Sequence, residues 1–188
     1  MFNFLESSIL VIVYFVSISV FSQEYKLSKD YSSIFVIGTS SLQDWKVEVE
    51  DFSGILFFNK RTKNITNLKI KIVSESLVGE KKGMNKKIYK ALKTNLFEEI
   101  VFVNDTFQEI EQINNSESKI KLKGNLNIAG VTKPIEVLVL FMQRSENIEI
   151  SGDIELNMEE FSIKPPRALF GTVKVKEKVT IKFNTVFE

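Results

Sequence analysis

The stretch KIKLKGNLNIAGVTKPIEVLVLF, residues 119–141, decides the fold class. In residues 119–128, apolar side chains alternate with Lys or Asn, so a strand of period two places all of the apolar side chains on one face. Residues 130–134 (GVTKP) predict a turn, and the return run Ile135–Phe141 has few polar residues on either face. We therefore expect a β-hairpin whose second strand is covered on one side and faces an apolar interior on the other.

The composition favours one globular domain and excludes most catalytic chemistry. The 188 residues are 44% hydrophobic, which suffices for a sizeable core. There is no cysteine and no histidine, so disulfides, thiol nucleophiles and the commonest metal ligand and general base are absent. The net charge of +1, with Lys and Glu interspersed, argues against nucleic-acid binding. We predict no catalytic residue, no metal site and no cofactor.

The N-terminal segment has the character of an export signal. Its apolar run, Ser8–Phe21, has the length of a signal-peptide core and is too short to span a bilayer as a helix. Its charged residue is Glu6, although export signals normally begin with a positive charge. We predict a signal peptide over residues 1–22, cleavage after Ser22, and a periplasmic or secreted domain of residues 23–188. An uncleaved hydrophobic anchor is the alternative.

Short runs rich in Val, Ile and Phe recur along the rest of the chain, with turn signals between them. Besides the hairpin, the expected strands are residues 32–39, 45–49, 55–58, 68–72, 100–103, 107–113, 148–158, and a final pair, 171–175 and 179–187, joined through 176–178. Between Gly79 and Glu99, apolar residues recur every four positions, which predicts one amphipathic helix. This order predicts a mainly β sandwich or closed barrel, and closure is favoured because it removes exposed edges. About eight strands can enclose one small ligand, although side chains alone can also fill the interior.

Four stretches carry a family resemblance: GTSSLQDW (38–45), MNKKIYKALK (84–93) with the strand after it, GNLNIAGVTKP (124–134) and FSIKPP (161–166). In this order and spacing they resemble the YceI-like family of bacterial lipid- and polyisoprenoid-binding proteins, over nearly all of residues 23–188. The resemblance implies a closed antiparallel, lipocalin-like β-barrel with a tunnel that shelters an isoprenoid or fatty-acyl chain. Gln43 stands where the family usually has His, and an amide can hydrogen-bond but cannot titrate near neutral pH.

Candidate ligand-binding residues follow from alternation along the strands expected to enclose the interior. They are Phe35, Ile37, Trp45, Phe57, Ile70, Ile72, Leu122, Leu126, Val137, Val139 and Phe141. Simple core packing is the alternative for each of them. Gln43 and Arg167 are candidates for contact with a polar headgroup, and Thr39, Ser41 and Asp44 suit turn formation equally well.

These observations predict an exported binding protein, not an enzyme, that carries or stores an amphipathic lipid: an isoprenoid quinone, a polyprenyl carrier or a fatty-acyl lipid. One alternative is an exported structural or interaction module with a solid core that binds protein or glycan. A second is a carboxylate-dependent hydrolase that uses Glu98 and Glu99, but neighbouring residues on a strand point to opposite faces. An exposed strand edge or the helix would suit a homodimer, and the oligomeric state stays open.

Overall fold

The computed structural model describes residues 22–81, 83–168 and 172–188, without the side chains of residues 106–108, 167 and 168. The predicted signal peptide lies outside these residues except for Ser22. In order, the described elements are β1 (Gln23–Ser40), β2 (Asp44–Val49), β3 (Phe52–Asn59), β4 (Asn64–Val73), the 3-10 helix η1 (Ser74–Ser76), β5 (Leu77–Gly79), α1 (Met84–Leu92), β6 (Glu99–Gln112), β7 (Glu117–Ile128), β8 (Val131–Gln143), β9 (Ile148–Asn157), the 3-10 helix η2 (Met158–Phe161), β10 (Arg167–Ala168) and β11 (Val173–Phe187). Among them, no helix has the length and apolar character needed to cross a membrane.

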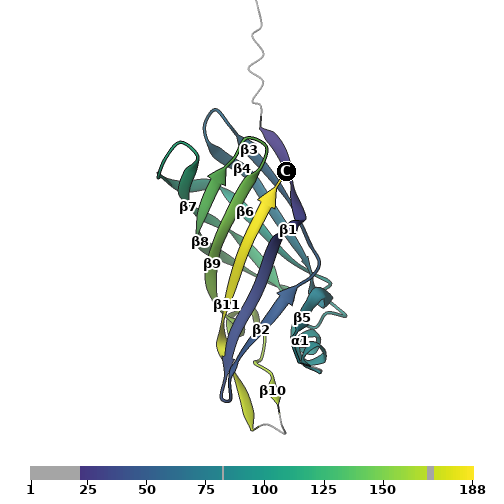
Figure 1. Cartoon of the computed structure of the whole chain (residues 1–188). Coiled ribbons are helices and arrows are strands. Elements are labelled where there is room, and N and C mark those ends of the chain that lie inside the picture. The colour runs from purple at the N-terminus through teal and green to yellow at the C-terminus, as the bar shows by residue number, and fades with distance from the viewer. Residues whose placement is uncertain (1–21, 82, 169–171) are drawn as a thin grey trace, which may run out of the picture.

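The strands form a closed antiparallel barrel. Its wall runs β11-β9-β8-β7-β6-β4-β3-β1, and the pairing of β1 with β11 closes the ring (Figure 1). The long strand β1 pairs with β3 through Gln23–Lys26 and with β2 through Phe35–Thr39. Strands β2 and β5 extend the sheet at the end of the barrel that carries α1 and β10 (Figure 1). The prediction of a mainly β, closed barrel of eight strands with one helix is confirmed.

The hairpin that predicted the fold is β7–β8, with an unbroken register from Glu117↔Met142 to Ile128↔Val131. The predicted turn over residues 130–134 is wrong. Ala129 and Gly130 both have positive φ (50° and 80°), and a two-residue turn of this kind matches the strand twist, so β8 already begins at Val131. The expected cover over the outer face of β8 is also wrong at Leu138, which is 60% exposed.

Three predicted boundaries need correction. Residues 100–103 and 107–113 belong to one strand, β6, with a register shift between its pairs at Asn104 and Gln108. The two strands predicted at the C-terminal end are one strand, β11, over its described residues. Lys178 stays in register opposite Asn157, and its ammonium group lies 2.7 Å from the Glu155 carboxylate. The helix spans nine residues rather than 79–99, because left-handed backbone at Gly83 and Lys93 begins and ends it.

Two apolar clusters fill the interior. The closed-end cluster consists of Tyr25, Leu56, Phe58, Ile65, Leu68, Ile120, Leu122, Val137, Val139, Phe141, Ile148, Ile150 and Phe187. The helix-end cluster consists of Ile34, Val47, Val49, Phe52, Leu77, Leu92, Leu126, Ile128, Ala129, Leu156, Phe161, Ile163 and Val179. The rings of Phe58 and Phe141 lie 5.0 Å apart, and Leu56, Phe58, Ile148 and Phe187 have no exposed surface, so side chains pack closely around these residues in the closed-end cluster.

Candidate functional site

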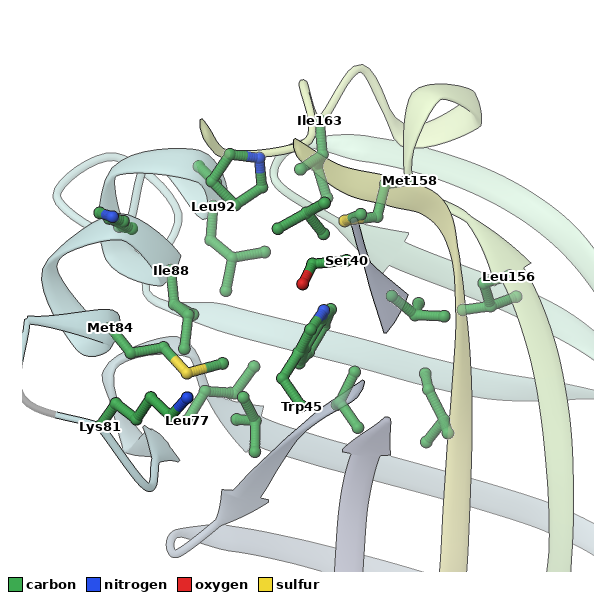
Figure 2. A pocket seen from close by; sticks show the side chains of 18 of the residues that line it. Ser40, Trp45, Leu77, Lys81, Met84, Ile88, Leu92, Leu156, Met158 and Ile163 are labelled. Atoms are coloured by element: carbon green, nitrogen blue, oxygen red, sulfur yellow. The ribbon is translucent and has the colours of Figure 1, made fainter. Parts of the chain in front are cut away.

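A cavity of about 520 Å³ lies at the end of the barrel that carries α1 (Figure 2). This volume falls within the range of about 300–1,000 Å³ that is typical of small-molecule sites. Its lining is mostly apolar and comes from strands of the wall, from α1 and from the segment after β9. The apolar lining side chains are Val36, Leu42, Trp45, Val47, Leu77, Met84, Ile88, Ala91, Leu92, Ile100, Ile128, Leu156, Met158, Phe161, Ile163, Pro166, Val173, Val175, Val179 and Ile181.

Helix α1 forms one wall of the cavity. Met84, Ile88 and Leu92 recur every four residues, so they lie on one face of the helix, and Figure 2 shows that face turned toward the cavity. On another face, the Tyr89 hydroxyl donates a 2.6 Å hydrogen bond to the backbone oxygen of Glu75 in η1. The helix is therefore attached to the barrel through polar contacts as well as through its apolar face.

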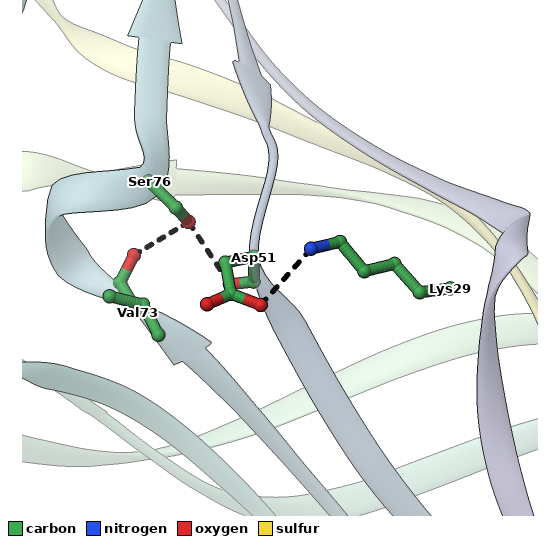
Figure 3. Close-up of polar contacts among 4 residues, drawn as sticks. All are labelled: Lys29, Asp51, Val73 and Ser76. Carbon is green, nitrogen blue, oxygen red and sulfur yellow. Dashed lines mark hydrogen bonds and ion pairs between the residues drawn. The ribbon is translucent and has the colours of Figure 1, made fainter.

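Helix η1, which holds α1, is itself fixed to the turn between β2 and β3. The Ser76 hydroxyl lies 3.0 Å from the backbone oxygen of Asp51 and 2.8 Å from that of Val73 (Figure 3). The Asp51 carboxylate pairs with Lys29 of β1 at 3.1 Å. These contacts join η1, the β2–β3 turn and β1 beside α1.

Trp45 forms the wall opposite the helix. Its ring packs on Gly38, its register partner on β1, where a Cβ would overlap the ring. The indole Nε1 is buried and has no hydrogen-bond partner among the described residues. Figure 2 shows this nitrogen-bearing edge turned toward Ser40. The site therefore offers a buried N–H donor beside an apolar surface, and an unpaired donor of this kind costs about 1–3 kcal/mol.

The turn between β1 and β2 forms part of the mouth. The Ser40 hydroxyl donates to the backbone oxygen of Gln43 at 2.8 Å, and the Ser41 hydroxyl accepts from the Lys174 backbone N–H at 3.1 Å. Both serine hydroxyls thus stabilise the turn. Gln43 is exposed and lines the mouth beside Leu42, which is 67% exposed.

The charges at the cavity are positive. Among the described lining residues, Lys81 and Lys87 are charged and none is Asp or Glu. Figure 2 shows Lys81 on the same side of the cavity as Met84. Because exposed lysines attract anions in a salt-dependent way, this rim favours a neutral or anionic group.

The carboxylates that the hydrolase alternative requires lie elsewhere. Glu98 and Glu99 are exposed and outside the described lining, and Glu99 pairs with Lys71 at 2.9 Å. On the same strand, a hydrogen bond from Lys121 lowers the pKa of the exposed Glu109. Glu99 and Glu109 form solvated ion pairs on the barrel surface and Glu98 is exposed, so these carboxylates are not an acid and base facing the cavity.

The structure brings two of the sequence-predicted site residues, Trp45 and Gln43, into the cavity lining. Phe35 and Ile37 flank the lining residue Val36, and the ammonium of Lys46 lies 3.5 Å from the Phe35 ring centre.

The other residues predicted to bind the ligand are outside the described lining. Leu122, Val137, Val139 and Phe141 belong to the closed-end cluster, and Leu126 belongs to the helix-end cluster. Ile70 packs against the closed-end cluster, Ile72 packs against the helix-end cluster, and Phe57 lies between the buried Leu56 and Phe58. The side chain of Arg167 lies outside the described part of the chain. Ligand contact by these residues stays a prediction.

Comparison with known proteins identifies the class of this barrel. Residues 25–187 match the model of the YceI-like domain. The chain therefore belongs to the YceI-like family. A comparison with curated proteins finds no significant match.

Solved structures share the fold at low sequence identity. Burkholderia cenocepacia BcnA is 16% identical with a TM-score of 0.69, over 85% of this chain and 98% of BcnA. A polyisoprenoid-binding domain from Saccharophagus degradans, implicated in plant cell wall breakdown, is 11% identical with a TM-score of 0.67, over 87% of this chain and 97% of that domain. The YceI protein of Campylobacter jejuni is 16% identical with a TM-score of 0.59, over 76% and 84% of the two chains.

Proposed function

We propose that this protein binds one amphipathic lipid, with the hydrocarbon tail in the cavity and the polar head at the mouth beside α1. The observation that carries the proposal is a cavity of about 520 Å³ with an apolar lining inside a YceI-like barrel. Transfer of hydrocarbon from water to such a site is worth about 0.8 kcal/mol per methylene group. A tail of ten methylene groups gains about 8 kcal/mol before the costs of association.

The Saccharophagus degradans neighbour is described as a polyisoprenoid-binding domain, which supports an isoprenoid or a related lipid as the ligand. Isoprenoid quinones, polyprenyl carriers and fatty-acyl lipids all join an apolar tail to a polar head. The apolar N-terminal segment supports export of the protein to the periplasm or the medium. There, a soluble carrier would shield the apolar tail of the lipid from water.

The groups at the mouth favour a head that carries oxygen atoms and a negative charge. Lys81 and Lys87 supply positive charge, the Gln43 amide can donate or accept, and the buried Trp45 Nε1 is a donor in need of an acceptor. Exposed ion pairs contribute only about 0.2–1 kcal/mol each, so the tail supplies most of the affinity and the mouth selects the head.

The described part of the cavity supports binding rather than catalysis. The lining residues include no Asp or Glu, and the chain has no His or Cys, so no general base or nucleophile of the common kinds faces the cavity. The alternative of a solid interaction module fits the closed-end half of the barrel. The cavity at the helix end favours the lipid carrier.

The test is recovery of the ligand from the native protein. The full chain is purified from its own host without detergent, weighed by native mass spectrometry, and extracted with organic solvent. We expect an adduct in the native spectrum whose mass reappears as a lipid in the extract. A protein that carries no adduct and takes up none of the lipids offered to it contradicts the proposal. The same spectrum reports the N-terminus, and a mass that begins at Gln23 supports cleavage.

A further inference from the structure

We propose that the outer face of α1 docks this protein on the surface of an anionic lipid bilayer, so that the mouth of the cavity lies beside the membrane. The proposal rests on the proposed function, since it gives the carrier a surface at which to exchange its lipid. A concentrated positive charge on the helix side of the mouth, together with exposed leucines beside it, points to this partner.

The positive charge of the chain is concentrated in one segment. Residues 81–97, the basic segment, contain six lysines and no Asp or Glu, and Glu80 and Glu98 border them. With these two glutamates included, residues 80–98 carry a net charge of +4, whereas the whole chain carries +1, so the rest of the chain carries −3. An anionic surface therefore attracts this segment and repels the remainder, which orients the protein as it approaches.

The structure exposes these lysines on the side of α1 that faces away from the cavity and along its flanks. Successive residues of a helix are about 100° apart, so Lys86 and Lys90 lie opposite the cavity-facing Ile88. The described lysines of the basic segment are all exposed: Lys81, Lys86, Lys87, Lys90 and Lys93. The helix therefore presents an apolar face to the cavity and a basic face to solvent.

The charge of the basic segment is not neutralised within the protein. None of its five described lysines forms an ion pair with another described residue. On the barrel wall, by contrast, Lys71, Lys121 and Lys178 each pair with a glutamate of the neighbouring strand at 2.6–2.9 Å. The lysines of the helix are therefore free to interact with an external anion.

The mouth of the cavity opens beside this basic surface. The exposed residues of the described lining are Leu42, Gln43, Lys81, Gly83 and Lys87, so three of the five belong to the basic segment. Leu42 is 67% exposed, and Leu96, in the basic segment, is 68% exposed. Leucines beside lysines suit the interface of an anionic bilayer, where apolar side chains enter the acyl boundary and ammonium groups stay among the headgroups. This combination favours a lipid surface over an acidic protein.

The acidic side chains at this end of the barrel define which side faces away from the membrane. Glu159 and Glu160 of η2 are exposed. Figure 2 shows Met158 of η2 across the cavity from Met84 of α1. The charges therefore fit a bilayer against the helix side of the mouth rather than one that covers the whole end.

The experiment measures binding to vesicles. The protein purified from its own host is sedimented with vesicles of phosphatidylcholine alone, or with about one-third phosphatidylglycerol, at low salt and at about 1 M salt, where the screening length is about 3 Å. We expect binding to the anionic vesicles at low salt. Binding to the neutral vesicles, or to the anionic vesicles at high salt, should be at least about tenfold weaker.

Substitution of lysines locates the docking surface. Each lysine close to an anionic membrane changes the partition coefficient about fivefold, so Lys86→Gln, Lys90→Gln and Lys93→Gln combined should lower binding to the anionic vesicles about 100-fold. These three positions are exposed and lie outside the described lining, so we expect the variant to fold and to keep its Kd for a fatty acid in solution.

The matched control combines Lys69→Gln, Lys119→Gln and Lys182→Gln. It removes the same charge from exposed positions of the barrel wall, and we expect vesicle binding to stay within about threefold of the natural chain. All variants keep the same N-terminus, so any binding through residues 1–22 is equal among them.

Failure of the natural chain to bind the anionic vesicles overturns the proposal, as does an equal effect of the two triple substitutions. Binding to immobilised polyglutamate without binding to vesicles also overturns it, in favour of an acidic protein partner. Titration with fatty acids and the matching alcohols in solution tests the cavity separately. A chain that binds these lipids but no vesicle loses only the docking surface, whereas one that binds vesicles but neither kind of lipid contradicts the proposed function.

Discussion

Filling the cavity from the helix side provides the sharpest test of where the ligand lies. Ala91 is on α1, lines the cavity and has the smallest side chain on that wall. Ala91→Phe adds six carbon atoms that point into the space between α1 and Trp45. The polar contacts that hold η1 and α1 lie on other faces, so we expect the helix to stay in place.

The magnitude follows from the number of methylene groups displaced. Six added carbon atoms exclude about four to six methylene groups of a tail, and each excluded group loses about 0.8 kcal/mol. The binding free energy therefore weakens by about 3–5 kcal/mol, which raises Kd at least about 100-fold. The folded state loses little, because the new ring occupies space that the protein's own side chains leave free.

The assay is titration with a lipid of 14–16 carbons, followed by the fluorescence of Trp45, with thermal unfolding as a measure of folding. Lys90→Phe is the matched control: it places the same ring on an exposed position of α1 outside the described lining, and we expect its Kd to stay within about threefold of the natural chain. Full affinity in a folded Ala91→Phe variant would refute the placement of the tail beside α1.

Substituting both Lys81 and Lys87 with Gln should weaken binding of a fatty acid about 3- to 10-fold at low salt, and should hardly change binding of the matching alcohol. Lys86→Gln is the control. Equal losses of affinity for the acid and the alcohol would contradict the role of charge. Gly38→Ala should destabilise the protein by about 1–3 kcal/mol in urea unfolding, because a Cβ there overlaps the Trp45 ring. The same variant should shift the emission of that tryptophan, and an unchanged spectrum would show that the ring does not depend on Gly38.

The fold could be predicted from the sequence because alternation is a local property. Residues 119–128 alternate strictly, so they report which face of the strand is buried, whatever the rest of the chain does. The four-residue period of Met84, Ile88 and Leu92 likewise identified the helix face that lines the cavity. Trp45, chosen by alternation, and Gln43, chosen as a headgroup candidate, both lie in the cavity lining, and their contact with a ligand stays a prediction.

Other lining residues could not be predicted because their strand is apolar on both faces. In β1, Phe35, Val36 and Ile37 are consecutive, so alternation does not say which one faces inward. The structure decides this through neighbours that are distant in sequence: Lys46 covers Phe35 on the outside, and Trp45 needs the inward space at Gly38.

The division of the barrel explains how one chain can be stable and still keep a hollow site. The closed-end cluster provides a dry, close-packed core that does not depend on a ligand. At the other end, hydrogen bonds join η1 to the turn before β3 and α1 to η1, so polar contacts as well as the apolar face of the helix determine where α1 lies. Because the site is already formed, a tail that enters it loses little of its burial energy to ordering the protein.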